Sequence, residues 1–111
     1  FRYNGQVCRV YGAEAPHEGQ FFYDTAKRFL AEQLPQYKVR IVGTFHADRR
    51  GKLCVLTKDD GTELAHDLIE RGYAWAAPYA DSGYRMKQSY AQHNQFGLWN
   101  ERNPSPPWSL K

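Results

Sequence analysis

Residues 9–18 read Arg-Val-Tyr-Gly-Ala-Glu-Ala-Pro-His-Glu, and the organisation of the chain follows from this stretch. Its first residues predict a β-strand in which Arg9 lies on one face while Cys8 and Val10 lie on the other. Gly12 then relaxes the backbone and ends the regular strand. The stretch therefore predicts a strand that opens directly into a loop.

The predicted loop carries side chains that can bind ions or move protons. Pro16 stops any further strand pairing. The loop is therefore expected to hold Glu14, His17 and Glu18 just beyond the strand. Together with Arg9 they bring a guanidinium, carboxylates and an imidazole to the point where a strand opens, which suits phosphate or metal chemistry.

The size and composition of the chain indicate one small domain. Its 111 residues are 41% hydrophobic and 15% aromatic, enough for a single core. No apolar run approaches the roughly 18 to 20 residues that a membrane-spanning helix needs. The net charge of +3 permits an anionic partner. Because the first residue is Phe1 and not Met, we expect that the chain has been processed or trimmed, and no signal peptide can be identified.

The two cysteines are interpreted as buried free thiols. Cys8 and Cys54 both fall in predicted strands, and a disulfide between them is the less favoured alternative. Their spacing matches no zinc motif.

Hydrophobic periodicity predicts the remaining elements. Asn4-Gly5 indicates a tight hairpin turn, so a strand must precede it and we expect that the upstream strand is truncated. Helices are predicted over residues 19–34, 64–71 and 82–96, and strands over 37–45 and 53–57. Gly72 and Gly97 are predicted to end the second and third helices. Alternating groups of strands and helices indicate a small α+β domain.

Several motifs, in order along the chain, resemble those of the staphylococcal nuclease (thermonuclease) family. Residues 9–17 resemble its Arg-x-x-Gly-x-Asp-Ala-Pro-Glu signature, and Asp48-Arg-Arg-Gly-Lys-Leu53 resembles its Asp-Arg-Tyr-Gly-Arg loop. Gly97-Leu-Trp99, with the later prolines and Trp108, resembles its C-terminal Gly-Leu-Trp … Pro-x-x-Pro-Trp segment. The helix that ends in Gly72-Tyr-Ala74 also fits the family pattern.

The resemblance implies a fold and an activity. The expected fold is a five-stranded oligonucleotide/oligosaccharide-binding (OB) barrel with three helices over residues 1–111, with its first strand truncated. The expected chemistry is calcium-assisted hydrolysis of DNA or RNA phosphodiesters, and the family suggests a secreted or periplasmic location. Trp99 and Trp108 are expected to anchor an extended proline-rich tail.

The catalytic positions carry over incompletely. The first family arginine is Arg9, and the loop aspartate that binds calcium is replaced by Glu14. The glutamate after the proline is replaced by His17, and the second arginine by Lys52, which offers a point charge in place of a bidentate fork. The upstream metal-binding aspartate has no counterpart. We expect calcium binding, if present, to be weak, because one carboxylate cannot supply six to eight oxygen ligands.

Nucleic acid could be contacted by a basic loop and by tyrosines. Arg49 and Arg50, with Lys52, form a basic segment that either contacts phosphates or is a solvated hairpin tip. Tyr79 and Tyr84 lie near where the family places tyrosines beside the nucleotide and could stack on a base, although partly buried aromatics are the favoured interpretation. His46, His66 and His93 lack ligand spacing with acidic residues and are interpreted as surface or structural residues.

Two functions remain open from the sequence. The leading hypothesis is a thermonuclease-like domain with a degraded site that binds nucleic acid weakly or serves as a scaffold for another partner. The alternative is an active metal-assisted phosphodiesterase, in which His17 is the general base and Glu18, whose side chain is expected to point elsewhere, could assist. The sequence leaves the oligomeric state open.

Overall fold

The computed structural model describes residues 1–3, 5–44, 52–101, 104 and 106–107. Its strands are β1 (Arg2–Tyr3), β2 (Gln6–Val10), β3 (Ala13–Glu14), β4 (Lys38–Thr44), β5 (Lys52–Thr57) and β6 (Trp75–Ala76). Its α-helices are α1 (Tyr23–Gln33), α2 (Leu64–Glu70) and α3 (Ser82–His93), with short 3₁₀ helices η1 (Leu34–Gln36) and η2 (Gly97–Asn100). The predicted α+β class with three helices is confirmed.

The strands form two separate sheets. One has the order β1-β2-β5-β4 and the other pairs β3 with β6. β2 and β5 run parallel, whereas the neighbouring pairs are antiparallel. Among the described residues these sheets do not close on themselves, so the predicted five-stranded barrel is not confirmed.

The predicted hairpin at the start of the chain is present. Tyr3 of β1 pairs with Gln6 of β2, which leaves two residues for the turn. Gly5 has a φ of +78°, the left-handed conformation that such turns require. Asn4 itself lies outside the described residues.

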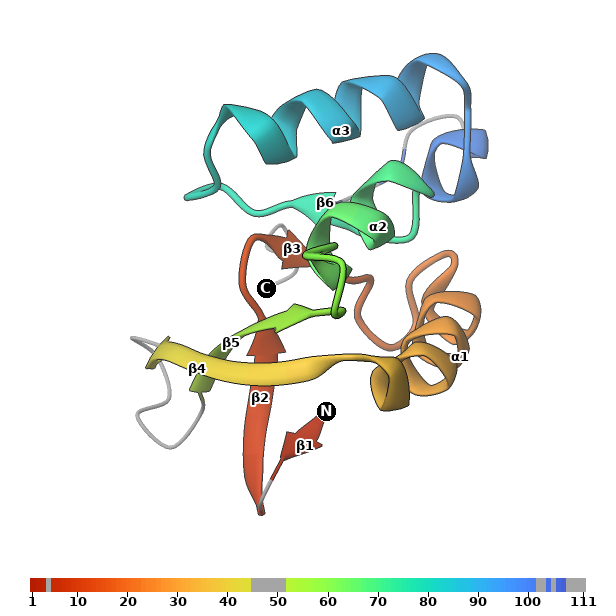
Figure 1. Cartoon of the computed structure of the whole chain (residues 1–111). Helices are drawn as coiled ribbons and strands as arrows, with labels where there is room; N and C mark the ends of the chain where they lie inside the picture. The colour runs from red at the N-terminus through yellow and green to blue at the C-terminus, as the bar shows by residue number, and fades with distance from the viewer. Residues whose placement is uncertain (4, 45–51, 102–103, 105, 108–111) are drawn as a thin grey trace.

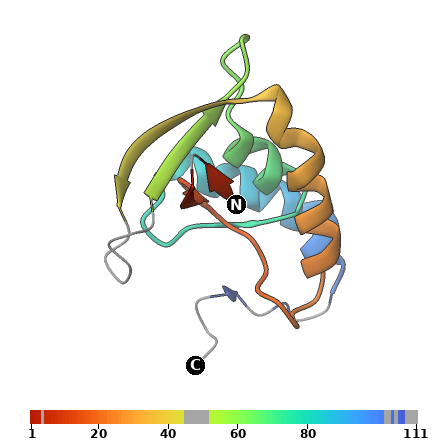
Figure 2. The same ribbon diagram turned by 90° about the horizontal axis from the view of Figure 1, so that it is seen from below.

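The core lies between the sheet and α2. Its fully buried side chains include Cys8 and Cys54 from adjacent strands, together with Leu56, Leu64 and Ile69. Both cysteines are free thiols, as predicted. Figure 1 shows α2 between the larger sheet and α3, and Figure 2 shows β4 starting beside the end of α1 and running away from that helix.

Two helices are shorter than periodicity predicts, for a backbone reason. α1 begins at Tyr23 and not at Gly19, because Phe22 has a φ of +73° and cannot continue a right-handed helix. α3 ends at His93 and not at residue 96, because Gln95 has a φ of +56°. α3 begins as expected, with the Asp81 carboxylate accepting a hydrogen bond from Gly83 N (3.0 Å).

Two glycines join the end of α2 to η2. Gly72 ends α2 as predicted, and the Tyr73 N–H donates to the Leu68 carbonyl (2.8 Å) in the pattern of a glycine cap. The Leu98 N–H donates to the Gly72 carbonyl (2.7 Å). A Cβ atom on Gly72 would lie 2.2 Å from the Phe96 carbonyl oxygen, and one on Gly97 would lie 2.3 Å from that of Gly72. Only glycine at both positions allows the two backbones to approach this closely.

Trp99 packs against β6, and its expected role as an anchor of the proline-rich tail stays a prediction. Its ring packs edge-to-face on Trp75 with centroids 4.5 Å apart. Trp108 lies outside the described residues. Within the described part of the chain, no helix has the length and apolar character needed to cross a membrane.

Candidate functional site

Arg9 lies on β2 with the orientation that alternation predicts. Its neighbour Cys8 is buried, whereas the Arg9 side chain is exposed. In the parallel pairing with β5, Arg9 is opposite Leu53. The strand therefore holds the guanidinium at the surface of the molecule, on a backbone that is part of the main sheet.

Glu14 is held by the second sheet. It lies on β3 opposite Trp75 of β6, so its backbone is fixed by strand pairing and not by a free loop. Burial raises the pKa of the Glu14 carboxyl, and the nearby positive charges of Arg9 and His17 offset only part of this effect.

A cavity of about 290 Å³ brings these residues together. Its lining includes Arg9, Glu14, His17 and Glu18. The sequence predicted that Glu18 points elsewhere, but it contributes to the same cavity. The loop is braced locally, because the His17 N–H donates to the Gln20 side chain (2.8 Å) and the Gln20 N–H donates to the His17 carbonyl (2.9 Å).

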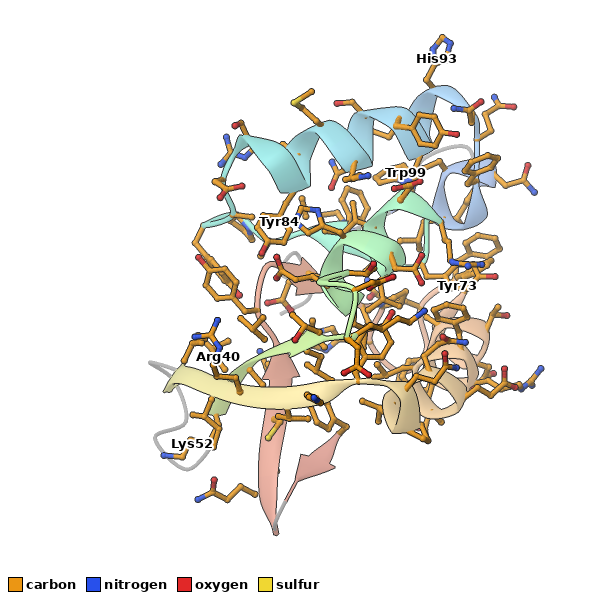
Figure 3. All side chains as sticks on the ribbon, in the orientation of Figure 1. Arg40, Lys52, Tyr73, Tyr84, His93 and Trp99 are labelled. Carbon is orange, nitrogen blue, oxygen red and sulfur yellow. The ribbon has the colours of Figure 1, made fainter. Side chains whose placement is uncertain are left out.

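The structure does not bring Lys52 to this cavity. Lys52 pairs with Cys8 and begins β5, one residue earlier than predicted. Side chains alternate along paired strands, so Lys52 shares the face of Cys8 and Arg9 lies on the opposite face. Figure 3 shows Lys52 at the start of β5 with its ammonium group pointing out of the molecule. The other two basic candidates, Arg49 and Arg50, lie outside the described residues.

Of the two candidate tyrosines, Tyr79 remains accessible. Its side chain is 49% exposed, its hydroxyl accepts a hydrogen bond from Gly12 N (3.1 Å), and its ring contacts Tyr11 with centroids 5.3 Å apart. Burial raises the pKa of Tyr79, and the charges of Glu14 and Arg9 also act on it, so it lies beside the candidate site.

Tyr84 is a core residue. It is only 6% exposed, and its ring packs against the Gly12 backbone, where an added Cβ would lie 2.6 Å from the ring. A ring in this position cannot present a face to a nucleotide base without moving out of the core. The structure therefore favours the buried interpretation of Tyr84 over the base-stacking one.

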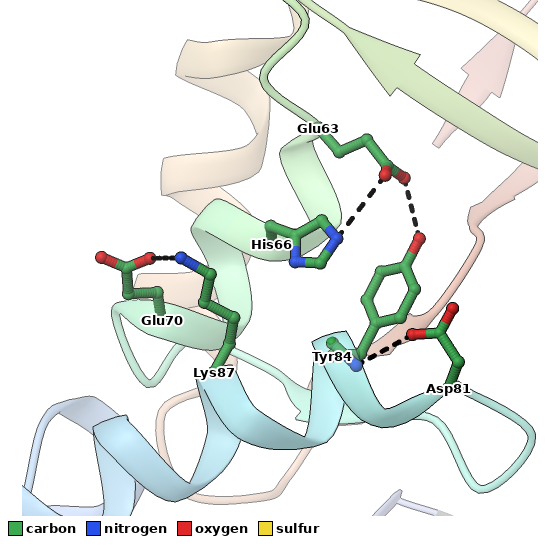
Figure 4. A network of polar contacts seen from close by, with 7 residues as sticks. Glu63, His66, Glu70, Asp81, Tyr84 and Lys87 are labelled. Carbon is green, nitrogen blue, oxygen red and sulfur yellow. Dashed lines mark hydrogen bonds and ion pairs between the residues drawn. The ribbon is translucent and has the colours of Figure 1, made fainter.

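A polar network beside Tyr84 was not expected from the sequence (Figure 4). The Tyr84 hydroxyl donates to Glu63 Oε1 (2.9 Å), and His66 Nε2 lies 3.5 Å from Glu63 Oε2. The imidazole also stacks on the Tyr84 ring with centroids 4.2 Å apart. His66 is therefore a structural residue, as the sequence interpretation expected, although its contact with Glu63 was not foreseen. The spacing of three residues between Glu63 and His66 at a helix start was the available signal.

The described residues fit a calcium ion poorly. Among residues 1–3, 5–44 and 52–101, no group of three or more histidine, cysteine, aspartate or glutamate side chains is arranged to hold a metal. The cavity offers two carboxylates, Glu14 and Glu18, and burial disfavours the charged form of Glu14. Calcium prefers six to eight oxygen ligands, so this donor set alone is insufficient.

Comparison with known proteins identifies a family. The model of the family described as staphylococcal nuclease homologue matches residues 7–101. A search of curated proteins finds no match.

Proposed function

Because the chain belongs to the staphylococcal nuclease homologue family, we propose that it is a thermonuclease-like domain with a degraded catalytic site, which binds nucleic-acid phosphates weakly. The observation that supports this proposal is that only one of the two expected cations reaches the cavity. Arg9 lines the cavity with Glu14 and His17, whereas Lys52 is not among its lining residues.

The absence of Lys52 from the cavity lining weakens phosphodiester hydrolysis for an electrostatic reason. Negative charge builds on the phosphate oxygens in the transition state, and positioned cations stabilise it. A phosphate bound in this cavity would contact the Arg9 guanidinium but not the Lys52 ammonium group. Binding of a phosphate needs only electrostatic attraction, whereas catalysis needs several groups held in a fixed arrangement. A site that has lost some of these groups can therefore still bind phosphate after it has lost activity.

The fold beyond the observed sheets is also a proposal. A five-stranded barrel would need a further strand beside β4, the terminal strand of the larger sheet among the described residues.

The experiment is a nuclease assay on single-stranded DNA and RNA, with calcium, then manganese, then EDTA. The original protein should show little or no metal-dependent cleavage but should bind the same oligonucleotides. Arg9→Ala should weaken that binding, whereas Arg28→Ala, which removes an exposed arginine from α1, should leave it nearly unchanged. Equal loss in both variants would contradict a phosphate site at Arg9.

The alternative is an active phosphodiesterase that uses His17 as its base. The observation that favours it is that His17 lines the same cavity as Arg9 and its charge acts on Glu14. In that case His17→Ala should lower the rate about 10²- to 10⁴-fold, the usual effect of losing a positioned acid or base. His17→Glu separates the two functions, because a degraded site should bind calcium better with the added carboxylate, whereas an active site should lose rate.

A further inference from the structure

Helix α1 forms one side of the cavity that contains Arg9. Its residues Tyr23 and Leu30 both line that cavity. Lys27 lies four residues after Tyr23 and three before Leu30, and these spacings place side chains on one face of a helix. The face of α1 that carries Lys27 is therefore the face that borders the cavity.

The ammonium group of Lys27 lies over the ring of Tyr23. The Lys27 Nζ atom is 5.6 Å from the ring centroid, within the distance at which a cation is attracted to an aromatic face. The Lys27 side chain is exposed, whereas Tyr23 is half-buried. Because Tyr23 lines the cavity, a cation that rests on this ring is held where α1 borders the cavity.

The charge of Lys27 is available to an anionic ligand. No ion pair between residues that the structure describes includes this lysine. Its contact with the Tyr23 ring uses one side of the ammonium group, which has three N–H donors. Lys27 can therefore bind a phosphate oxygen while it remains on the ring.

A phosphate site at this cavity needs a cation besides Arg9. The lining also includes two carboxylates, Glu14 and Glu18. Burial raises the pKa of Glu14 and so favours its neutral form, but Glu18 is exposed and its negative charge offsets that of Arg9. Lys52 does not line the cavity. Lys27 can supply the missing positive charge, because its helix face borders the cavity.

We propose that Lys27 is a second phosphate-binding residue for a nucleic-acid strand, and that Tyr23 is the residue that positions its ammonium group. This inference rests on the proposed function and extends the site from β2 to α1. One phosphate of the strand pairs with Arg9 and a neighbouring phosphate pairs with Lys27, so the strand crosses the mouth of the cavity. A lysine suits this role because it binds phosphate as a point charge and needs no fixed geometry.

The test measures binding of a fluorescein-labelled oligothymidylate to the whole chain by fluorescence anisotropy, at salt concentrations from about 50 to 200 mM. Lys27→Ala should weaken binding about 3- to 10-fold at the lowest salt. It should also reduce the magnitude of the slope of log affinity against log salt by about 0.7, the value for one phosphate contact on a single strand.

Arg28→Ala is the matched control for Lys27→Ala. It removes the same charge from an exposed position one residue further along α1, about 100° around the helix and so away from the face of Tyr23. Its affinity and slope should stay close to those of the original protein. Equal losses in the two variants would show that only the overall charge matters and would overturn the role of Lys27.

Variants of Tyr23 test the positioning role. Tyr23→Phe keeps the ring and should bind like the original protein, whereas Tyr23→Leu removes the ring and should weaken binding about 2- to 5-fold. In a Lys27→Ala background, Tyr23→Leu should have no further effect, because the group that it positions is absent. A loss of the same size in both backgrounds would mean that Tyr23 acts independently of Lys27.

Arg9→Ala distinguishes failure of this inference from failure of the proposed function. If Arg9→Ala weakens binding while Lys27→Ala binds like the original protein, the inference is wrong and the phosphate site at Arg9 is retained. If Arg9→Ala also binds like the original protein, or if the original protein does not bind the oligonucleotide, both are wrong. Lys27 is exposed, so Lys27→Ala should fold normally, and urea unfolding checks this.

Discussion

Gly12 allows the segment that carries Glu14 to pack closely against Tyr84 and the residues before α3. Its N–H donates to the Tyr79 hydroxyl (3.1 Å), its carbonyl accepts from the Ala77 N–H (2.9 Å), and its Cα faces the buried Tyr84 ring. A single residue therefore connects the loop of Glu14 to the segment before α3. Any side chain at this position would push these elements apart.

Gly12→Ala should therefore be strongly destabilising. Gly12 has a φ of +89°, and an added Cβ would lie 2.6 Å from Tyr84 Cε1. Backbone strain of about 1 to 2 kcal/mol and overpacking of about 1 to 3 kcal/mol should together lower the free energy of unfolding by about 2 to 5 kcal/mol. Urea unfolding monitored by circular dichroism measures this loss.

Gly61→Ala is the matched control for that substitution. Gly61 has the same φ of +89°, but an added Cβ meets no atom within 4 Å. Its loss should be limited to the strain of about 1 to 2 kcal/mol. Equal losses at the two positions would show that the contact with Tyr84 is unimportant.

Glu14 should give stability a characteristic pH dependence. Burial raises its pKa above the ordinary value of 4.5, so the folded protein holds this proton more tightly than the unfolded chain does. Stability from this group is therefore present at low pH and is lost as the pH rises from about 4.5 through the raised pKa of the folded state. Glu14→Gln cannot ionise and should avoid that loss.

The expected result is that Glu14→Gln gains stability relative to the original protein as the pH rises from 4 to 7. Urea unfolding at several pH values measures the difference, with Glu18→Gln as a control carboxylate in the same cavity. A difference that stays constant over this range, or one that moves in the opposite direction, would count against a buried, proton-holding Glu14.

The network around Glu63 joins two helices. Glu63 immediately precedes α2, and it accepts a hydrogen bond from Tyr84, which lies in the first turn of α3. His66 on α2 stacks on the same tyrosine ring. The contact therefore holds the beginnings of α2 and α3 together.

Tyr84→Phe removes only the hydroxyl and should lower the free energy of unfolding by about 1.5 to 3 kcal/mol, the usual contribution of a hydrogen bond to a carboxylate. Tyr90→Phe, whose ring is 51% exposed on the same helix, should change it by less than about 0.5 kcal/mol. Thermal unfolding of both variants checks the prediction, and a Tyr84→Phe variant as stable as Tyr90→Phe would refute it.

Most elements could be predicted from periodicity, but their ends could not. The stripe from Phe22 to Leu34 identifies α1, yet the left-handed backbone at Phe22 depends on packing against Tyr73, which lies far along the chain. The end of α3 at His93, shortly before the left-handed backbone at Gln95, was also missed. Strand existence is a local property, whereas these irregular positions are decided by tertiary contacts.

The candidate site was predicted only in part. The alternation of side chains between the two faces of a strand explains why Arg9 was placed correctly and Lys52 was not. Arg9, Glu14 and His17 are close in sequence, so a strand followed by a turn was sufficient to bring them together. The face on which Lys52 lies depends on the register of β5 against β2, because a shift of one residue in the pairing moves a side chain to the other face. The pairing of Cys8 with Lys52 decides this, and no local pattern reveals it.

For the molecule as a whole, nucleic-acid binding should depend strongly on salt. With a net charge of +3 and no base-reading motif recognised in the sequence, binding is expected to come from phosphate contacts. Three or four such contacts should reduce affinity for a single-stranded oligonucleotide about 20- to 50-fold between 50 and 200 mM salt. Fluorescence anisotropy across that range measures the slope.

Arg9→Ala should reduce the magnitude of the slope of log affinity against log salt by about 0.7, the value for one phosphate contact on a single strand. Arg28→Ala, on the exposed side of α1, should leave the slope unchanged. Affinity that is independent of salt would contradict a phosphate-based interface.

The parallel pairing of β2 with β5 also has a consequence for the order of folding. β4 and β5 are antiparallel and follow one another in the chain, whereas β2 must meet β5 from more than forty residues away. Distant pairings form late because closing a long loop costs entropy before any contact compensates for it. Substitutions at β5 positions that pair with β4, such as Val55→Ala, should therefore slow folding, whereas Val10→Ala on β2 should mainly speed unfolding. Stopped-flow chevrons of the two variants would distinguish these effects, and the reverse pattern would mean that the strand carrying Arg9 forms first.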